Sequence, residues 1–412
     1  MAAAITAAQR ARILAVALVA VALATAGVLV YGLITTRGVA GMLGDLEIYT
    51  GAINYALGGG DLYSYTYTHP TVHGLGFTYP PFAAIVLAPF ALVDPLVAKV
   101  IWTILTFAVV VACLSVLVRG AAAKPYGRAS VAGRGAAHTA WVAGLSVPVM
   151  LSYPFLHNLI VGQVSLFVIA LALFDHLLPR RWQGFLVGLS AAIKLTPLVF
   201  LPYYLVTRQW RQAAVCGGTF AGVTGLAFAL LPGPSVTYWT DKLWQTGRVG
   251  RTDSTVNKSL LGLLSRQLPE GVSATLVWLA LAAAVAALAY WRAARHLRDG
   301  DALAATLAVG ALSVAVSPIS WPHHQLWLVL AAAWYLLLRG RTPLALGIVL
   351  FAAFFGYPWF EDYPAGSVSG LLGVGVELPA LAVLVVLGFG LLPVRRDLLD
   401  RAAATAAASP GP

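Results

Sequence analysis

Apolar runs of roughly 15 to 24 residues recur along this chain from Ile13 to Leu392, and short arginine-rich segments separate them. A run of that length suits a helix that crosses a lipid bilayer. Only 10% of the 412 residues are charged and 60% are hydrophobic, whereas soluble domains have about 25% charged residues. The sequence therefore predicts an all-α integral membrane protein, and it excludes a soluble enzyme and a nucleic-acid-binding module.

The runs predict a single polytopic membrane domain over residues 1–412, organised as a helical bundle. Crossings are expected at Ile13–Thr36, Leu96–Val118, His138–Pro154, Gln163–Leu178, Ala213–Leu231, Val272–Trp291, Leu303–Pro318, His323–Leu338, Pro343–Tyr357 and Leu371–Leu392. Between Gly184 and Thr207, a Lys-Leu-Thr-Pro sequence interrupts an apolar run and predicts two short or re-entrant helices. The total is about 12 transmembrane or re-entrant segments, and such an even number places both chain ends on one side. Pro81–Val93 is too short to cross and is expected to be an accessory or re-entrant helix.

The basic residues fall mainly on one side of this arrangement. Eighteen of the 26 lysines and arginines do so: Arg10, Arg12, Arg119, Lys124, Arg128, Arg134, Arg180, Arg181, Arg208, Arg211, Arg292, Arg295, Arg298, Arg339, Arg341, Arg395, Arg396 and Arg401. Cytoplasmic loops of membrane proteins are rich in lysine and arginine. We therefore expect this side, with both termini, to face the cytoplasm of a bacterial cell, and the long loops 37–80 and 232–271 to lie on the periplasmic or external side.

The first outer loop carries acidic and aromatic side chains. Asp45 follows the first crossing directly, at the level of lipid headgroups, where a carboxylate could accept a proton from a sugar hydroxyl. An equally good interpretation is that Asp45 caps a helix beginning at Leu46. Asp61 follows three glycines and fits a turn or cap residue better than a substrate ligand, although binding stays open. Tyr49 and its neighbours offer rings for stacking on sugars, but tyrosine is common at any membrane interface.

Two further features predict polar chemistry inside an apolar chain. The segment SPISWPHHQLW places His323 and His324 at the outer mouth of a helix, about 100° apart, so that at most one readily faces a given cleft. Either imidazole could bind a phosphate or a sugar hydroxyl, or be held by a backbone carbonyl. Lys194 lies deep in an apolar run, where a lysine is costly and is a functional candidate. Its alternative is that the side chain extends to the membrane interface.

Several lysines and arginines lie on the expected outer side, although basic residues are usually concentrated on the cytoplasmic side. Lys258 and Arg266 lie in the second outer loop and suggest an anionic ligand such as a lipid phosphate. The plainer interpretation is ordinary solvation of the loop. Glu361 adds a carboxylate near the outer end of the chain's last helices and is a further candidate for substrate binding. Nearly all plausible chemistry is therefore expected at the outer face.

At these residues the sequence resembles the polyprenol-phosphate-mannose-dependent mannosyltransferases of glycosyltransferase family 87, which have the GT-C architecture. The matching segments are GDLEIYTGA, GGGDLY, FTYPPFAAIVLAPFALV, VGQVSLFVIALAL, AAIKLTPLVFLPYYL, STVNKSLLGLL and SPISWPHHQLW. Each segment alone is loose, but together they follow the family's order over about two thirds of the chain.

The resemblance implies an inverting transfer of mannose from polyprenyl phosphate mannose to a phosphatidylinositol mannoside, forming an α-1,2 linkage. Asp45 would be the general base, and His323, with His324 left open, would lie beside the donor phosphate or the acceptor. Lys194, Lys258 or Arg266 would neutralise the leaving phosphate. No cofactor is required, and no nucleic acid partner is expected. Where the family often has an acidic residue before the two histidines, this chain has Pro322, so no metal ligand is assigned and a divalent metal is left open.

Two alternatives remain at this point. One is an α-1,2-branching mannosyltransferase of lipomannan or lipoarabinomannan within the same family. The other is a transporter or flippase of a lipid-linked sugar, for which a buried lysine such as Lys194 would be typical. The long outer loops, the one-sided polar residues and the lack of a visible repeat favour the transferase.

Overall fold

The computed structural model describes residues 6–38, 41–69, 72–128, 135–269, 271–355 and 381–387. Its main elements are α1 Ala7–Arg37, α2 Gly44–Leu57, β1 Tyr67–His69, β2 Val72–Leu75, α3 Pro81–Ala91, α4 Pro95–Ala122, α5 Ala136–Leu151, α6 Tyr153–Val161, α7 Ser165–Phe174, α8 Phe185–Ile193, α9 Phe200–Val206, α10 Trp210–Leu230, α11 Pro232–Thr240, α12 Leu260–Gln267, α13 Ala274–Arg298, α14 Ala302–Val316, α15 Leu326–Leu337 and α16 Arg341–Phe355. Short 3₁₀ turns lie between them at η2 Asp175–Leu177, η3 Thr196–Val199, η4 Lys242–Trp244, η5 Thr246–Arg248 and η6 Pro322–Gln325. The all-α prediction holds for the described residues, apart from the antiparallel pair β1–β2.

Four helices, α1, α4, α10 and α13, are long and apolar enough to cross a membrane. The pair α5 and α6 would make a fifth span, although it bends by 72° at Ser152. Shorter apolar helices occupy most of the other predicted ranges in the described chain, so the positions of the helices are well predicted. The total of about 12 segments stays a prediction, and most of the predicted crossing Leu371–Leu392 lies outside the described residues.

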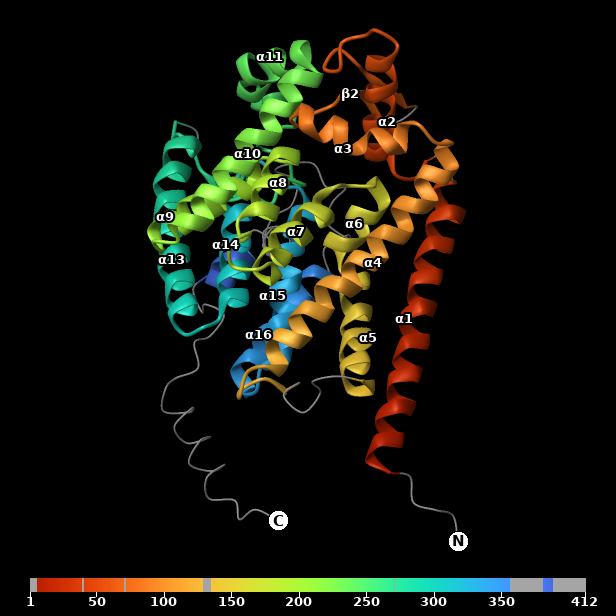
Figure 1. Ribbon diagram of the computed structural model, residues 1–412, viewed down its shortest axis with the longest axis vertical. Coiled ribbons are helices and arrows are strands. Elements are labelled where there is room, and N and C mark those ends of the chain that lie inside the picture. Colours follow the sequence, from red (N-terminus) through yellow and green to blue (C-terminus); the bar gives the residue numbers. More distant parts are fainter. Residues whose placement is uncertain are drawn as a thin grey trace.

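Two of the shorter helices form the centre of the molecule. All but one of the residues of α15 are buried, and α14 is buried nearly as completely. In Figure 1, α15 lies among α4, α7 and α14. Alanine-rich α14 lets α15 approach closely, and Gly310 is where the contact is tightest, since a Cβ there would lie 2.2 Å from the Trp327 ring. Dense packing of this kind leaves no room for an added methyl group. The central pair therefore gives the surrounding helices a rigid support.

The predicted break between Gly184 and Thr207 is present. Helix α8 ends at Ile193, Lys194 adopts an extended conformation (φ −148°, ψ 124°), and η3 and α9 follow. Pro197, three residues after Lys194, has no N–H to donate to the Ile193 carbonyl, and this disfavours continuation of the α8 helix. The accessory helix predicted at Pro81–Val93 is α3, with 11 residues.

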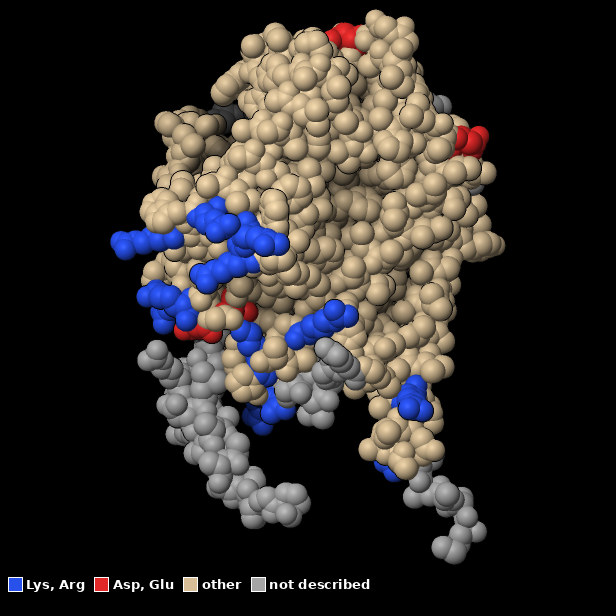
Figure 2. All heavy atoms as spheres, viewed as in Figure 1, with Lys and Arg blue, Asp and Glu red and all other residues tan. Residues whose placement is uncertain are grey.

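The two ends of the bundle differ in charge. At one end Lys124 contacts Gly300, and Arg128 contacts Leu338 and Gly340, so the ends of α4, α13 and α15 meet there. Figure 2 shows lysine and arginine side chains gathered over this end, where α1 also begins, while the opposite end shows isolated acidic groups. Asp45 and the turn before α15 lie at that opposite end, because α1 and α14 both run towards it.

Candidate functional site

The start of α2 is fixed by its contact with the end of α6. The Leu43 N–H donates to the Ile160 carbonyl (2.9 Å), and Leu43 has a positive φ of 59°, which is rare for a residue with a side chain. Gly162 (φ 73°) lies against it, and a Cβ on Gly162 would approach the Leu43 Cβ to 2.8 Å. A side chain at position 162 would therefore be disfavoured both by the positive φ and by the contact with Leu43. This contact brings Asp45, two residues after Leu43, next to Gln163.

Asp45 lies in the first turn of α2 and is not its cap. The helix begins at Gly44 without a side-chain cap hydrogen bond, so the interpretation of Asp45 as the cap of a helix beginning at Leu46 is wrong. The Asp45 Oδ2 accepts a hydrogen bond from Gln163 Nε2. Burial raises the pKa of Asp45 from 3.8 to about 6, although Gln163 and the Lys194 ammonium oppose this shift. A carboxylate with that pKa is ionised at neutral pH and is a stronger base than an exposed one.

From Gln163, a chain of hydrogen bonds continues to Lys194. The Tyr79 hydroxyl donates to Gln163 Oε1 (2.7 Å), and the Lys194 Nζ lies 3.5 Å from that hydroxyl. Lys194 Nζ also contacts Ser165 Oγ and His324 Nε2, each at 2.8 Å. Lys194 is 9% exposed, so its amine is held inside the protein by these partners.

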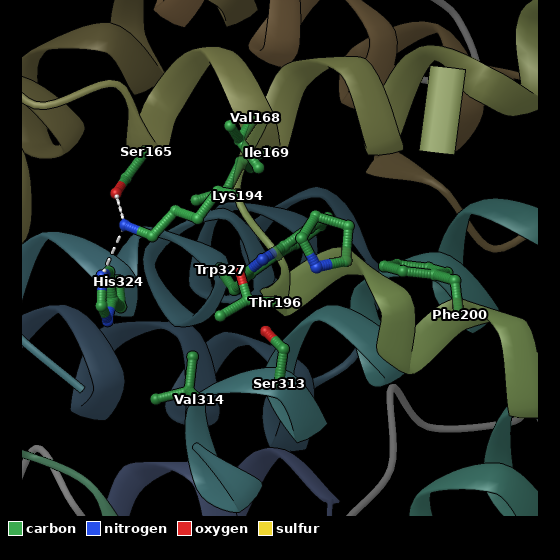
Figure 3. A pocket seen from close by; sticks show the side chains of 11 residues that line it. Ser165, Val168, Ile169, Lys194, Thr196, Phe200, Ser313, Val314, His324 and Trp327 are labelled. Atoms are coloured by element: carbon green, nitrogen blue, oxygen red, sulfur yellow. Dashed lines mark hydrogen bonds between the residues drawn. The ribbon is translucent and has the colours of Figure 1, made fainter. Parts of the chain in front are cut away.

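Figure 3 shows the Lys194 side chain reaching towards Ser165 and His324, away from Phe200 at the other side of the pocket. The cavity itself is about 20 Å³, with Trp327 and Thr196 among its lining residues. A cavity of that size holds about one water molecule.

The two adjacent histidines point to different partners, as their spacing predicts. Their rings are perpendicular, and His324 is the one that reaches Lys194. His323 instead stacks on His157 of α6, with the two Nδ1 atoms 3.2 Å apart. His324, and not the initially favoured His323, is therefore the member of the pair that joins the Asp45–Lys194 chain.

Tyr49 belongs to the same cluster, whereas the second carboxylate of α2 does not. The buried Tyr49 hydroxyl lies 3.2 Å from that of Tyr79. Glu47 points elsewhere: its Oε1 pairs with Lys99 Nζ (2.6 Å) and its Oε2 accepts from the Tyr67 hydroxyl (2.6 Å). Both Glu47 oxygens are thus engaged, so Asp45 is the better candidate for a base.

The other predicted site residues that the structure describes, Asp61, Lys258 and Arg266, have hydrogen-bond partners outside the chain from Asp45 to His324. Asp61 accepts from the Tyr63 N–H and the Ser64 hydroxyl, so it is a turn residue. Lys258 and Arg266 donate to carbonyl groups of their own loop. The Lys258 backbone also donates to the Ser320 carbonyl, so that loop braces the turn before His324. Glu361 lies outside the described residues.

Comparison with known proteins identifies the family of the chain. The model of glycosyltransferase family 87 matches residues 77–318. The chain belongs to glycosyltransferase family 87. The expected family is thereby confirmed, and with it the expectation of a glycosyltransferase enzyme.

Two relatives of this family 87 chain have informative names. A polyprenol-phosphate-mannose-dependent alpha-(1-2)-phosphatidylinositol mannoside mannosyltransferase of Mycobacterium tuberculosis is 32% identical over 89% of each chain. A polyprenol-phosphate-mannose-dependent alpha-(1-2)-phosphatidylinositol pentamannoside mannosyltransferase of Mycolicibacterium smegmatis is 32% identical over 77% of this chain and 76% of its own. No solved structure matches the chain.

Three residues of the Asp45–Lys194 hydrogen-bonded chain, Gln163, Ser165 and Tyr79, are not among the site residues predicted from the sequence. Gln163 and Ser165 lie in VGQVSLF and Tyr79 in FTYPP, so polar residues at the edges of apolar runs were the available signal. Arg248 donates to the Phe77 and Thr78 carbonyls (3.1 and 3.0 Å) and so joins the second outer loop to the segment that carries Tyr79. In the part of the chain that the structure describes, no three His, Cys, Asp or Glu side chains group to hold a metal ion.

The raised pKa of Asp45 in this family 87 chain predicts a cost in stability. A carboxyl group whose pKa is higher in the folded than in the unfolded state stabilises the fold at low pH, and this contribution is lost as the pH rises from about 4 through about 6. Asp45→Asn, which is always neutral, is therefore expected to be more stable than the parent above pH 6, by up to about 3 kcal/mol, and similar to it near pH 4. Thermal unfolding in detergent at both pH values measures this, with Asp253→Asn as the control. A lower melting temperature for Asp45→Asn at pH 8 would contradict the assignment.

Proposed function

We propose that this chain transfers mannose from polyprenyl phosphate mannose to a hydroxyl of a phosphatidylinositol mannoside, with inversion, forming an α-1,2 linkage. The names of its relatives supply the donor and acceptor classes. The observation that carries the proposal is the hydrogen-bonded chain from Asp45 through Gln163 and Tyr79 to Lys194. It holds a base and a cation at opposite ends of one largely buried network.

In this reaction the acceptor hydroxyl gives its proton to the Asp45 carboxylate while its oxygen bonds to the anomeric carbon of the donor mannose. The bond from that carbon to the phosphate oxygen breaks, and the electron pair leaves with polyprenyl phosphate. Negative charge develops on the leaving oxygen, so a nearby cation lowers the barrier. We assign this role to Lys194, with His324 as the second group at the phosphate.

The enzyme is proposed to lie in the bacterial cytoplasmic membrane as a multi-pass protein of about 12 segments, with both termini in the cytoplasm and Asp45 at the outer face. The gathering of basic residues at the end opposite Asp45 supports this orientation. Because Cys113 and Cys216 are both fully buried, single introduced cysteines can report on it. An impermeant maleimide should label Arg251→Cys, an 83% exposed side chain at the Asp45 end, in intact cells. Labelling of Arg298→Cys instead would reverse the orientation.

A transfer assay tests the reaction itself. The purified protein in lipid vesicles is given donor labelled in its mannose, with phosphatidylinositol mannoside as acceptor. Label should appear in a glycolipid one mannose larger than the acceptor, and the stereochemistry and linkage of the product can be read by nuclear magnetic resonance. Label that only crosses the vesicle wall would indicate a transporter. Transfer to lipomannan but not to the smaller acceptor would indicate the branching activity.

A further inference from the structure

Gln163 occupies a position that the transfer reaction does not itself require. Its side chain is 8% exposed, it carries no charge, and it lies between Asp45 and Tyr79. Its backbone N–H donates to the Asn158 carbonyl (3.1 Å) at the end of α6, close to where Leu43 docks on Ile160. One helix end therefore holds both Gln163 and the start of α2.

In this network the hydrogen bonds are donated in sequence towards Asp45, from Tyr49 to Tyr79, from Tyr79 to Gln163 and from Gln163 to Asp45. The Tyr79 hydroxyl oxygen faces two donors, the Tyr49 hydroxyl and the Lys194 Nζ, so its own proton is directed to Gln163 Oε1. Ser165 Oγ also lies 3.4 Å from that oxygen. With the amide oxygen fixed on this side, the Gln163 NH₂ group must face Asp45. The orientation of the amide is thus determined by its neighbours, and hydrogen bonds in such chains reinforce one another.

The fixed orientation of the Gln163 amide makes the two carboxylate oxygens of Asp45 different from each other. Oδ2 receives the Gln163 hydrogen bond, whereas Oδ1 has no donor among the residues that the structure describes. A carboxylate held by one oxygen cannot rotate freely, and its other oxygen is left to accept a proton. We propose that Gln163 is a positioning residue, locked by Tyr79, that aims the Asp45 carboxylate at the acceptor hydroxyl. This inference rests on the proposed function, because it assumes that Asp45 is the base.

The role of Gln163 predicts a change in the pH profile. The groups that act electrostatically on Asp45 or hydrogen-bond to it are Lys194 and Gln163, with the hydroxyls of Tyr49, Tyr67 and Tyr79 nearby. The Gln163 hydrogen bond lowers the pKa of Asp45, so its removal raises that pKa. Activity needs the ionised base and is lost as the pH falls through the pKa of Asp45, so the acidic limb of kcat/KM should move to higher pH.

Gln163→Met keeps the length of the side chain and removes the amide. Because a hydrogen bond to a charged group is substantial, we expect transfer at pH 6.5 to fall by about tenfold to a hundredfold, with partial recovery at pH 8.5 and little change in KM for the donor. Gln163→Glu, which keeps a polar group of the same size, should shift the limb in the same direction because two carboxyl groups share the site. The matched control is Gln212→Met, a buried glutamine on α10, which should keep the parental profile.

A double-mutant cycle tests the contribution of Tyr79. If Tyr79 acts by orienting Gln163, then Tyr79→Phe should lower the transfer rate of the parent. The same substitution should lower the rate of Gln163→Met little further. Full additivity would overturn the lock, and a parental acidic limb in both Gln163 variants would overturn the positioning role.

The outcomes separate this inference from the proposed function. If Asp45→Asn retains turnover, the base assignment fails and the inference fails with it. If Asp45→Asn is inactive while the Gln163 variants keep the parental limb, only the inference fails. Should Gln163→Met be lost from the membrane, Gln163→Glu supplies the same comparison.

Discussion

Asp45→Asn is expected to lower kcat for mannose transfer by roughly 10²- to 10⁴-fold, the range that a positioned general base supplies. The substitution preserves the shape of the side chain and can still meet the Gln163 amide through its oxygen, but it cannot accept a proton. KM for the donor should change little, because the loss falls on the chemical step. The measurement is initial-rate transfer of labelled mannose by protein in vesicles, corrected for the amount of folded protein.

The control for this variant is Asp253→Asn. Asp253 is a carboxylate of the second outer loop whose partner is the exposed Arg251, so its neutralisation should leave the rate within a factor of two or so of the parent. Turnover by Asp45→Asn at a tenth of the parental rate or more would show that another group takes the proton.

Lys194→Met should cost roughly 10²- to 10³-fold in kcat/KM, as expected when one group that stabilises developing negative charge is removed. Methionine fills similar volume in a buried position, but it leaves Asp45, Ser165 and His324 without this partner, so the rate is corrected for the amount of folded protein. The loss should appear both in kcat and in the binding of the product polyprenyl phosphate. Inhibition of transfer by added polyprenyl phosphate measures the second effect without any chemistry.

Lys242→Met is the matched control, since Lys242 is a lysine of the second outer loop paired with Asp241. If Lys194→Met weakened transfer but left product inhibition at the parental level, the amine would not contact the phosphate. Its role would then be confined to ordering Ser165 and His324, which it contacts in the structure.

Much of this fold follows from local patterns. Helices α1 and α4 are largely apolar and are 31 and 28 residues long. Runs of that length are typical of helices that cross a bilayer, so their positions are predictable from the sequence. The break at Lys194 is equally predictable, because Pro197 has no N–H to donate to the Ile193 carbonyl, which disfavours a helix that continues through this point. Asp45, Tyr49, Lys194 and His324 were also identified as candidates, Lys194 because an ionisable group within an apolar run is costly and the others because they lie at the outer ends of such runs.

The connections between these residues were not predictable from the chain. Gln163 is one amide among several, and only the docking of Leu43 on Ile160 makes it the partner of Asp45. Lys99 lies within a predicted crossing, and its pairing with Glu47 depends on how α2 packs against α4. The choice between His323 and His324 required the position of His157, which is 166 residues away. Such contacts depend on tertiary packing between residues far apart in the chain, and no periodic pattern in the sequence indicates them.

The close approach of Leu43 to Gly162 gives the protein an uneven tolerance to change. The turn that contains Asp61 is held by its own hydrogen bonds, so exposed positions around it can vary in sequence with little effect on the proposed catalytic carboxylate. A methyl group added at Gly162 would push α2 outward and misdirect the base without touching it. Screens for loss of activity should therefore recover Gly162→Ala at the end of α6, although Gly162 has no side chain that could take part in the chemistry.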